Sequence, residues 1–363
     1  MTHAMSTSEM HGPSVGPLPS VGDRQRESDR GQTITPALRR PLGMPGLVHE
    51  FATPMTVLLN ENHGITDLGI HGLYEKGKAQ QWDASRDLDW EQAAPPGNPL
   101  AMPDPTLAIF GTPLWQSMDE ATRAHVRHDI QSWNISQILY GEQAALICAS
   151  RLTQGEGALE MKLAAASQVI DEARHIEAYA RLVRTRFDAS FAISPSLHAL
   201  FGNIISESRL DFTCLGMQIL VEGMALSMFQ NMRAYSADPM FRTLLTLILR
   251  DEARHFAIGK LSLGKVYAEL TSHEIAEREE FVCESAVQLH EHVCANEVWA
   301  SVGLSKSQRK ELVFDSQVSL NVRRSIFRRL VPTVRDMGLL GPRAQRVFAG
   351  LDMLEYAAFP TAA

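Results

Sequence analysis

The chain has 363 residues, of which 45% are apolar and 21% charged; this composition is typical of a globular protein with a sizeable core and excludes disorder as its main state. A formal charge of −8 provides no basic surface for nucleic acid, and the apolar stretches end at charges well short of the ~20 residues that a membrane span needs. Four widely spaced cysteines without a CxxC pair indicate neither a disulfide framework nor a thiolate zinc site, so we expect a soluble, cytoplasmic protein.

The sequence predicts four successive parts. Residues 1–45 are rich in Ser, Thr, Gly, Pro and charge and are expected to form a flexible tail. Residues 46–112 contain the stretch APPGNPLAMPDP and are expected to be an irregular extension over the core. In residues 113–302 Pro is scarce and apolar residues recur at three- and four-residue steps, which predicts a helical bundle. Residues 303–363 are expected to add C-terminal helices packed on the bundle.

The predicted fold class is all-α, a helical bundle with additional N- and C-terminal helices, because no segment has the pattern of a β-strand. Apolar periodicity places the helices at 117–153, 157–188, 196–236 with a break near Glu207, 239–268, 273–301, 305–329 and 342–357.

One five-residue motif, Asp-Glu-Ala-Arg-His, occurs twice, 80 positions apart, at 171–175 and 251–255. In each copy the glutamate and the histidine are three residues apart (Glu172 with His175, Glu252 with His255), so one helix face presents a carboxylate and an imidazole to the same point. A single copy would fit a solvated, charged helix surface. Two copies with matched upstream glutamates favour a metal site instead.

Those upstream glutamates are Glu142 and Glu222, each 30 residues before the glutamate of its motif and surrounded by apolar residues. Turn signals lie at both midpoints, at 154–157 and 236–239. A chain that folds back at the midpoint as two antiparallel helices brings both ends of the interval to one level, ~22 Å from the turn. We therefore expect Glu142 beside Glu172, and Glu222 beside Glu252.

Buried carboxylates need a partner, because a bare charge on an apolar helix face costs several kcal/mol. Two metal ions would serve as that partner, with oxygen-rich ligands and one imidazole each, a donor set that suits iron or manganese. The four negative charges balance two divalent cations. The predicted metal ligands, which are also the predicted catalytic residues, are Glu142, Glu172, His175, Glu222, Glu252 and His255.

This pattern resembles the ferritin-like di-iron carboxylate oxygenases, and its Asp-Glu-x-Arg-His form looks like the hydroxylase subunits of bacterial multicomponent monooxygenases. The resemblance covers residues 115–270. It implies a ferritin-like four-helix bundle with two iron ions, or one manganese and one iron, that activates O2. It also implies that Asp171 and Asp251 accept hydrogen bonds from the ligand histidines, usually each from the histidine of the other motif, and that Arg174 and Arg254 neutralise these aspartates.

The expected function is that of an O2-dependent di-iron oxygenase, a monooxygenase that hydroxylates or N-oxygenates a small organic substrate. The chain has no GxGxxG motif and no four-cysteine cluster, so electrons are expected from a separate reductase or ferredoxin, or from the substrate. A homodimer is expected by analogy.

Two other classes stay open at this point. Tyr179 follows His175 by four residues, where the similar small subunits of ribonucleotide reductase carry a radical tyrosine, so a radical-generating subunit is one alternative. A core tyrosine is the simpler interpretation of this residue. An iron-binding ferritin relative is the other alternative, although long segments flank the bundle.

The pattern also resembles the arylamine N-oxygenases, which carry an additional histidine ligand four residues before the second motif's glutamate. Ile248 stands at that place here, so the sequence departs from their pattern. Acyl-carrier desaturases share the two motifs, but no carrier-docking surface is identified. The substrate is therefore left open.

Some residues near the motifs allow two interpretations each. Gly141 and Gly223 adjoin ligands and indicate a bulge, room for a substrate or tight helix packing. Glu156, Glu160 and Glu207 compete as ligands but lie near turns or polar residues. Residues 290–292 (His-Glu-His) are expected at the surface, with contact to the site as the alternative. Candidate pocket residues are Ala144, Ala145, Met217, Met224, Ala225 and Phe256.

Overall fold

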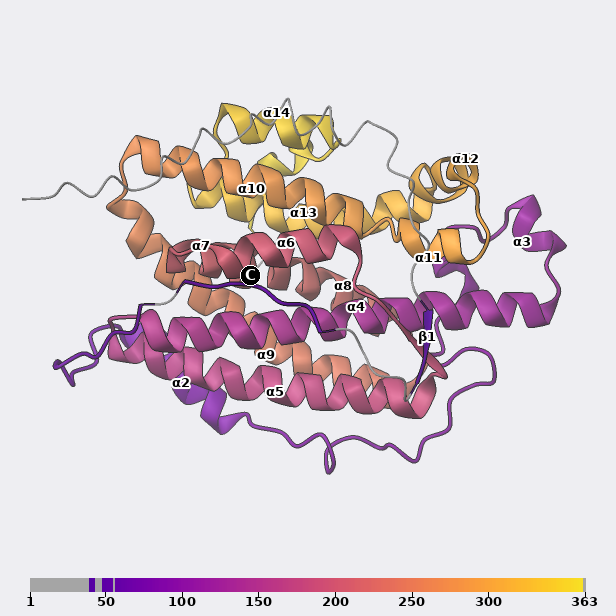
Figure 1. Ribbon diagram of the computed structural model, residues 1–363, viewed down its shortest axis with the longest axis horizontal. Coiled ribbons are helices and arrows are strands. Elements are labelled where there is room, and N and C mark those ends of the chain that lie inside the picture. The colour runs from indigo at the N-terminus through magenta and orange to yellow at the C-terminus, as the bar shows by residue number, and fades with distance from the viewer. Residues whose placement is uncertain (1–38, 43–47, 55, 362–363) are drawn as a thin grey trace, which may run out of the picture. The chain divides into compact units, whose positions relative to one another are not determined.

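Two long helix pairs form the centre of the fold (Figure 1). The computed structural model describes residues 39–42, 48–54 and 56–361. Helix α4 (Glu120–Gly155) packs along α5 (Leu159–Arg186), and α8 (Glu222–Tyr235) packs along α9 (Pro239–Ala268). These four helices confirm the predicted bundle.

Both pairs reverse where the sequence carries its turn signals. Helix α4 ends at Gly155 and α5 begins at Leu159, so the chain turns within three residues. Helix α9 begins at Pro239, and the Asp238 side chain accepts a hydrogen bond from the Phe241 amide. Proline at the first helical position and an aspartate cap are both favourable at a helix start. The folding-back predicted for each 30-residue interval is therefore confirmed.

The third predicted helix is interrupted twice. Helix α6 (Pro195–Ser206) ends at the predicted break, where Glu207 is extended, and α7 (Leu210–Cys214) follows. A π-helical segment, η2 (Leu215–Val221), then leads into α8. Segment Leu210–Tyr235 is long and apolar enough to cross a membrane, but 89% of its most apolar window is buried inside the protein. Its hydrophobicity is thus that of a core helix.

Further helices cover the bundle on two sides (Figure 1). Helix α2 (Leu68–Ala79) packs on α5 and α9, whereas α10 (Ser272–His292) packs on α6, and α13 (Gln317–Asp336) packs on α8. The shorter elements are η1 (Asp104–Thr106), α3 (Pro113–Ser117), α11 (Asn296–Ser301), α12 (Lys306–Gln308), η3 (Arg309–Phe314), α14 (Pro342–Gly350) and η4 (Leu354–Ala358).

Several expectations need correction. Strand β1 (Arg39–Pro41) pairs antiparallel with β2 (Ala189–Phe191), so the described chain is not entirely without β-structure. Residues 39–42, predicted to belong to a flexible tail, are therefore partly in this ladder; the rest of that tail lies outside the described residues. Helix α2 lies in the segment predicted to be irregular, and the helix predicted at 273–301 is broken at Ala295, where φ is +50°. The division of the chain into four parts stays a prediction.

His290 of α10 generates a prediction about stability. Its ring lies between Phe314 and Phe327, at centroid distances of 5.8 and 6.1 Å. Burial, with a smaller contribution from Arg323, lowers the pKa of His290 from 6.5 to about 4. Between these two pH values the unfolded chain binds the proton and the folded chain does not, so stability falls as pH falls from 6.5 towards 4.

We predict that His290→Gln reduces the loss of unfolding free energy between pH 7 and pH 5 by about 2 kcal/mol. Chemical denaturation at the two pH values measures this difference. His273→Gln is the matched control, because His273 is an exposed histidine of the same helix. An equal pH dependence in wild type and His290→Gln would contradict the prediction.

Candidate metal centre

The six predicted ligands meet inside the bundle. Glu142 comes from α4, Glu172 and His175 from α5, Glu222 from the start of α8, and Glu252 and His255 from α9. All six are buried, and none has more than 5% of its surface exposed. Their oxygen and nitrogen atoms form two groups in which all ligand atoms lie within 4.8 Å of one another. The first group, here the first subsite, is Glu142, Glu172, His175 and Glu252; the second subsite is Glu172, Glu222 and His255.

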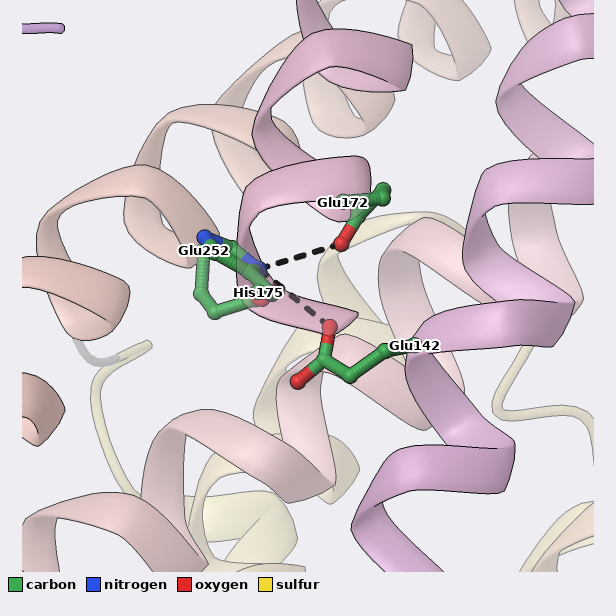
Figure 2. Close-up of side chains that lie close together, drawn as sticks. All are labelled: Glu142, Glu172, His175 and Glu252. Carbon is green, nitrogen blue, oxygen red and sulfur yellow. Dashed lines mark hydrogen bonds and ion pairs between the residues drawn. The ribbon is translucent and has the colours of Figure 1, made fainter. Parts of the chain in front are cut away.

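Two of the carboxylates each lie close to both histidines. Glu172 places Oε2 3.1 Å from His175 Nδ1 and Oε1 3.2 Å from His255 Nδ1. Glu252 places Oε1 3.3 Å from His175 Nδ1 and Oε2 3.7 Å from His255 Nδ1. Glu142 approaches only His175, at 3.2 Å. Figure 2 shows how Glu142, Glu172 and Glu252 converge on the His175 ring. Glu172 and Glu252 therefore have the geometry of bridging ligands, and Glu142 and Glu222 that of terminal ones.

The outer nitrogen of each histidine faces an aspartate of the other motif. His255 Nε2 lies 3.1 Å from Asp171, and His175 Nε2 lies 3.4 Å from Asp251. This is the crossed pairing that the family resemblance implies. Hydrogen bonding at Nε2 leaves Nδ1 directed into the site, which fixes the orientation of each ring.

Two arginines neutralise both aspartates. Arg174 lies 2.5 Å from Asp171 and 3.2 Å from Asp251, and Arg254 donates to the same two carboxylates at 2.5 and 3.0 Å. Burial acts to raise the pKa of Asp171 and of Asp251, but the histidines and Arg254 outweigh it and hold both below the usual range. Both aspartates are therefore ionised and act as acceptors.

Sequence reasoning missed two residues that complete this network. Gln81 and Trp82 follow α2, and they donate hydrogen bonds to Asp171 at 3.1 Å and to Asp251 at 2.7 Å. The Trp82 ring stacks on His175, with a centroid distance of 6.2 Å, and carries the Arg174 guanidinium at 4.9 Å. No signal in the sequence links them to the motifs, because they lie 90 and 169 positions away from their partners.

A second missed group is a buried chain of amides. Gln168 Nε2 donates to Glu222 at 2.7 Å and to Glu172 at 3.0 Å, and its oxygen accepts from Gln218 at 2.6 Å. Gln218 lies in η2 and in turn accepts from the Cys214 thiol. Gln168 lies 80 positions before Ile248, so the two residues occupy the same place in the two repeats. This matching place in the repeat is the sequence signal that could have identified Gln168.

The site places four carboxyl groups close together in an apolar interior, which disfavours the ionisation of all four at once. Burial raises the pKa of Glu142 to about 8, and burial with the neighbouring Glu252 raises the pKa of Glu222 well above its usual range. Burial opposes ionisation of His175 and His255, yet the glutamates raise the pKa of both rings well above 6.5. Without cations, the cluster therefore retains protons to offset its charge.

The donor set fits a pair of metal ions. Among the described residues, Glu222 Oε2, Glu252 Oε2 and His255 Nδ1 are buried and have no hydrogen-bond partner. Leaving such atoms unpaired costs about 1–3 kcal/mol each. Four carboxylates and two imidazole nitrogens, two of the carboxylates shared, are the oxygen-rich set that iron and manganese take. Cations at the two subsites would satisfy the orphaned atoms.

The three glutamates that were alternative candidates for metal ligands either have other partners or lie elsewhere. Glu160 accepts hydrogen bonds from Thr66 and from the Asp67 amide at the start of α2, and Glu207 pairs with Arg209. Glu156 follows the end of α4. None of the three belongs to either subsite.

Tyr179 is fully buried one turn beyond His175, and its hydroxyl has no hydrogen-bond partner in the described part of the chain. Burial, then the charge on Glu142, raises its pKa well above 10. Its ring packs at 6.2 Å from Phe229. The residue is thus a neutral core tyrosine in this arrangement.

A cavity of about 60 Å³ adjoins the glutamates Glu142, Glu222 and Glu252. Four predicted pocket residues line it, namely Ala145, Met217, Met224 and Ala225; Ala144 and Phe256 are not in its wall. Gly141 also lines it, and a methyl group added there would meet no described atom within 4 Å, whereas one at Gly223 would meet Leu330 at 2.8 Å. Gly141 therefore provides room, and Gly223 allows close helix packing.

The expectation that residues 290–292 lie at the surface is wrong for both histidines. His292 is 4% exposed and lines the cavity, and His290 is buried under α13. Only Glu291 is exposed. Trp133, whose ring lies 5.4 Å from that of His292, covers this end of α10.

Fold and site together define the chain as a ferritin-like dimetal carboxylate protein. Residues 69–338 match the model of the family described as P-aminobenzoate N-oxygenase AurF, and the chain belongs to this family. The predicted superfamily is thereby confirmed, and Ile248 in place of a third histidine does not exclude membership. No curated protein sequence matches the chain.

Several solved structures are similar to the chain. Dimanganese(II)-NrdF of Streptococcus sanguinis aligns with 78% of this chain and 96% of its own, at 12% identity and a TM-score of 0.50. The R2-like ligand-binding oxidase of Sulfolobus acidocaldarius aligns with 71% of this chain and 91% of its own, at 17% identity and a TM-score of 0.42. A mutant R2-like ligand-binding oxidase with a Mn/Fe cofactor covers 79% and 93%, at 14% identity and a TM-score of 0.40. The first of these supports the ferritin-like bundle.

The contacts of Gln168 give a prediction. Gln168→Leu removes the donor shared by Glu222 and Glu172 while keeping a side chain of similar size, so we expect the second subsite to bind Fe(II) or Mn(II) about 10-fold more weakly. Anaerobic equilibrium titration of the metal measures this affinity.

Gln143→Leu is the control for this experiment, because Gln143 is an exposed glutamine on α4 that bonds only the Leu139 carbonyl. Unchanged affinity at both subsites of Gln168→Leu would show that the amide does not position the carboxylates.

Proposed function

We propose that the chain is a dimetal N-oxygenase that uses O2 to oxidise an amine nitrogen on a small organic substrate. The chain is a member of an N-oxygenase family with a buried carboxylate and histidine cluster, and it is a dimetal oxidoreductase that uses O2. The observation that carries the proposal is the pair of glutamates, Glu172 and Glu252, that each lie close to both imidazoles, together with the apolar cavity that Glu252 lines.

The six ligand residues have separate tasks in this proposal. Glu142 and His175 would hold one ion, Glu222 and His255 would hold the other, and Glu172 and Glu252 would be shared by the two. When bound, two iron ions, or one manganese and one iron, supply the O2-binding site and the redox equivalents. Asp171 and Asp251 keep the outer histidine nitrogens hydrogen-bonded, and Arg174 and Arg254 keep both aspartates ionised.

The reaction balances with an external reductant. An amine, O2, two electrons and two protons give a hydroxylamine and water. We assign the electrons to a separate reductase or ferredoxin, since the sequence has no flavin, nicotinamide or iron–sulfur motif of its own. Hydroxylation of carbon by the same site is the second candidate reaction. A cytoplasmic location and a homodimer belong to the proposal as well.

Metal loading tests the proposal directly. We expect the wild-type chain to bind two Fe(II) ions under anaerobic conditions and to give a transient visible absorption on exposure to O2. Glu142→Ala and Glu222→Ala each remove a terminal ligand, so each should bind about one ion and lose the transient.

Glu156→Ala serves as the control for loading, because Glu156 belongs to neither subsite. Iron bound at full stoichiometry without any spectral change on O2 addition would contradict the proposal.

The alternative radical-generating function depends on Tyr179. We expect Tyr179→Phe to retain the O2-induced absorption and the product yield, and we expect no tyrosyl signal by electron spin resonance in the wild type after O2. The substitution removes a buried hydroxyl without a hydrogen-bond partner in the described residues, so it should leave stability unchanged or slightly increased. A tyrosyl signal that disappears in Tyr179→Phe would favour the radical-generating alternative.

A further inference from the structure

The cavity beside the metal centre runs along α4. Its α4 wall extends from Glu142 through Gly141 and Ile138 to Asn134. Eight residues of helix correspond to ~12 Å. The α8 wall runs from Glu222 to Phe229, so it leaves the metal level in the same direction along the antiparallel helix. The cavity thus includes the level of the glutamates, where Ala145 and Met217 also line it, and reaches a far end near Asn134.

Sulfur and aromatic side chains line much of the cavity. Met217, Met224 and Met228 face it together with Phe201 and Phe229. Methionine adapts to the shape of a ligand and makes favourable contacts with aromatic edges. A volume of about 60 Å³ holds on the order of four to six water molecules. The space and its walls therefore suit one substituted aromatic ring.

The far end is polar but uncharged. Gln137 is engaged by the backbone, since it donates to the Ala192 carbonyl at 2.9 Å and accepts from the Ser194 amide at 2.8 Å. His292 Nδ1 lies 3.0 Å from the Ser194 hydroxyl, which leaves Nε2 without a hydrogen-bond partner among the described residues. Asn134 likewise makes no side-chain hydrogen bond within the described ranges. Burial lowers the pKa of His292 to about 4, so its ring is neutral at physiological pH.

None of the described residues in the cavity wall is a lysine or an arginine. The ionisable groups in the wall are the three glutamates at the metal end and the neutral His292. The far end is only partly open to solvent, since Asn134 is half-buried. A ligand anion there would therefore lose part of its hydration without gaining a counter-charge from the wall, which is unfavourable. A neutral group that both donates and accepts hydrogen bonds would pair with Asn134 and with His292 Nε2.

We infer that the substrate is an arylamine whose far substituent, para to the amine, is an uncharged hydrogen-bonding group such as an amide or an alcohol, and not a carboxylate. This inference rests on the proposed N-oxygenation for the placement of the amine at the metal end. The inferred substrate therefore differs in charge from p-aminobenzoate, the compound named in the family's description.

Binding to the metal-loaded, full-length protein tests the inference without turnover. 4-Aminobenzamide and 4-aminobenzoate have nearly the same size and differ in charge, and their dissociation constants can be measured by calorimetry at pH 7. We expect the amide to bind at least about 10-fold more tightly than the carboxylate.

A charge placed at the far end should change this order. Asn134→Lys puts a cation beside the para substituent and should abolish or reverse the preference, and Asn134→Leu should weaken binding of the amide but not of unsubstituted aniline. Gln143→Lys is the matched control, because it adds the same charge to an exposed position of α4 that does not line the cavity.

The wild-type ratio decides the inference even if a variant does not fold. Equal or tighter binding of 4-aminobenzoate, or no binding of either compound, would overturn it. Preserved binding order without any oxidation of the bound amine would leave the inference standing and contradict the proposed function instead.

Discussion

The central constraint on this fold is the burial of charge. Four carboxylates and two imidazoles lie at one level inside an apolar bundle, and the raised pKa values of Glu142 and Glu222 show how unfavourable their ionised state is without cations. Each histidine is held by an aspartate, each aspartate by two arginines, and one aspartate by Trp82. The bundle can contain this cluster because every charge has a partner of opposite sign or a place for an ion.

The two halves of the site repeat each other, but they are not equivalent. The motif copies supply the same ligands from α5 and α9, and the crossed aspartates make the halves depend on each other. Gln168 breaks the symmetry, because it contacts Glu172 and Glu222 from the place where the second repeat has Ile248. The π-helical turn before Glu222 has no counterpart before Glu142. A dimetal site with unlike halves offers different environments to its two ions.

The meeting of the six predicted ligands at one place could be predicted because their signals are local. Helical spacing within each motif and equal intervals to the upstream glutamates are properties of single helices and single turns, and a four-helix bundle preserves both. Gln81 and Trp82 could not be predicted, since tertiary contacts alone bring them to the aspartates. The three-residue strands carry too little pattern to detect. The burial of His292 depends on Ser194 and Trp133 from other elements, and its own helix gives no sign of it.

The attachment of α2 to the aspartates has a consequence for how the protein holds its ions. Gln81 and Trp82 join the end of α2 to the same carboxylates that orient the ligand imidazoles. The packing of α2 on α5 and α9 and the orientation of the ligand imidazoles are therefore connected through two side-chain hydrogen bonds. A segment outside the four-helix bundle thus contributes to the geometry in which the six side chains would receive their ions.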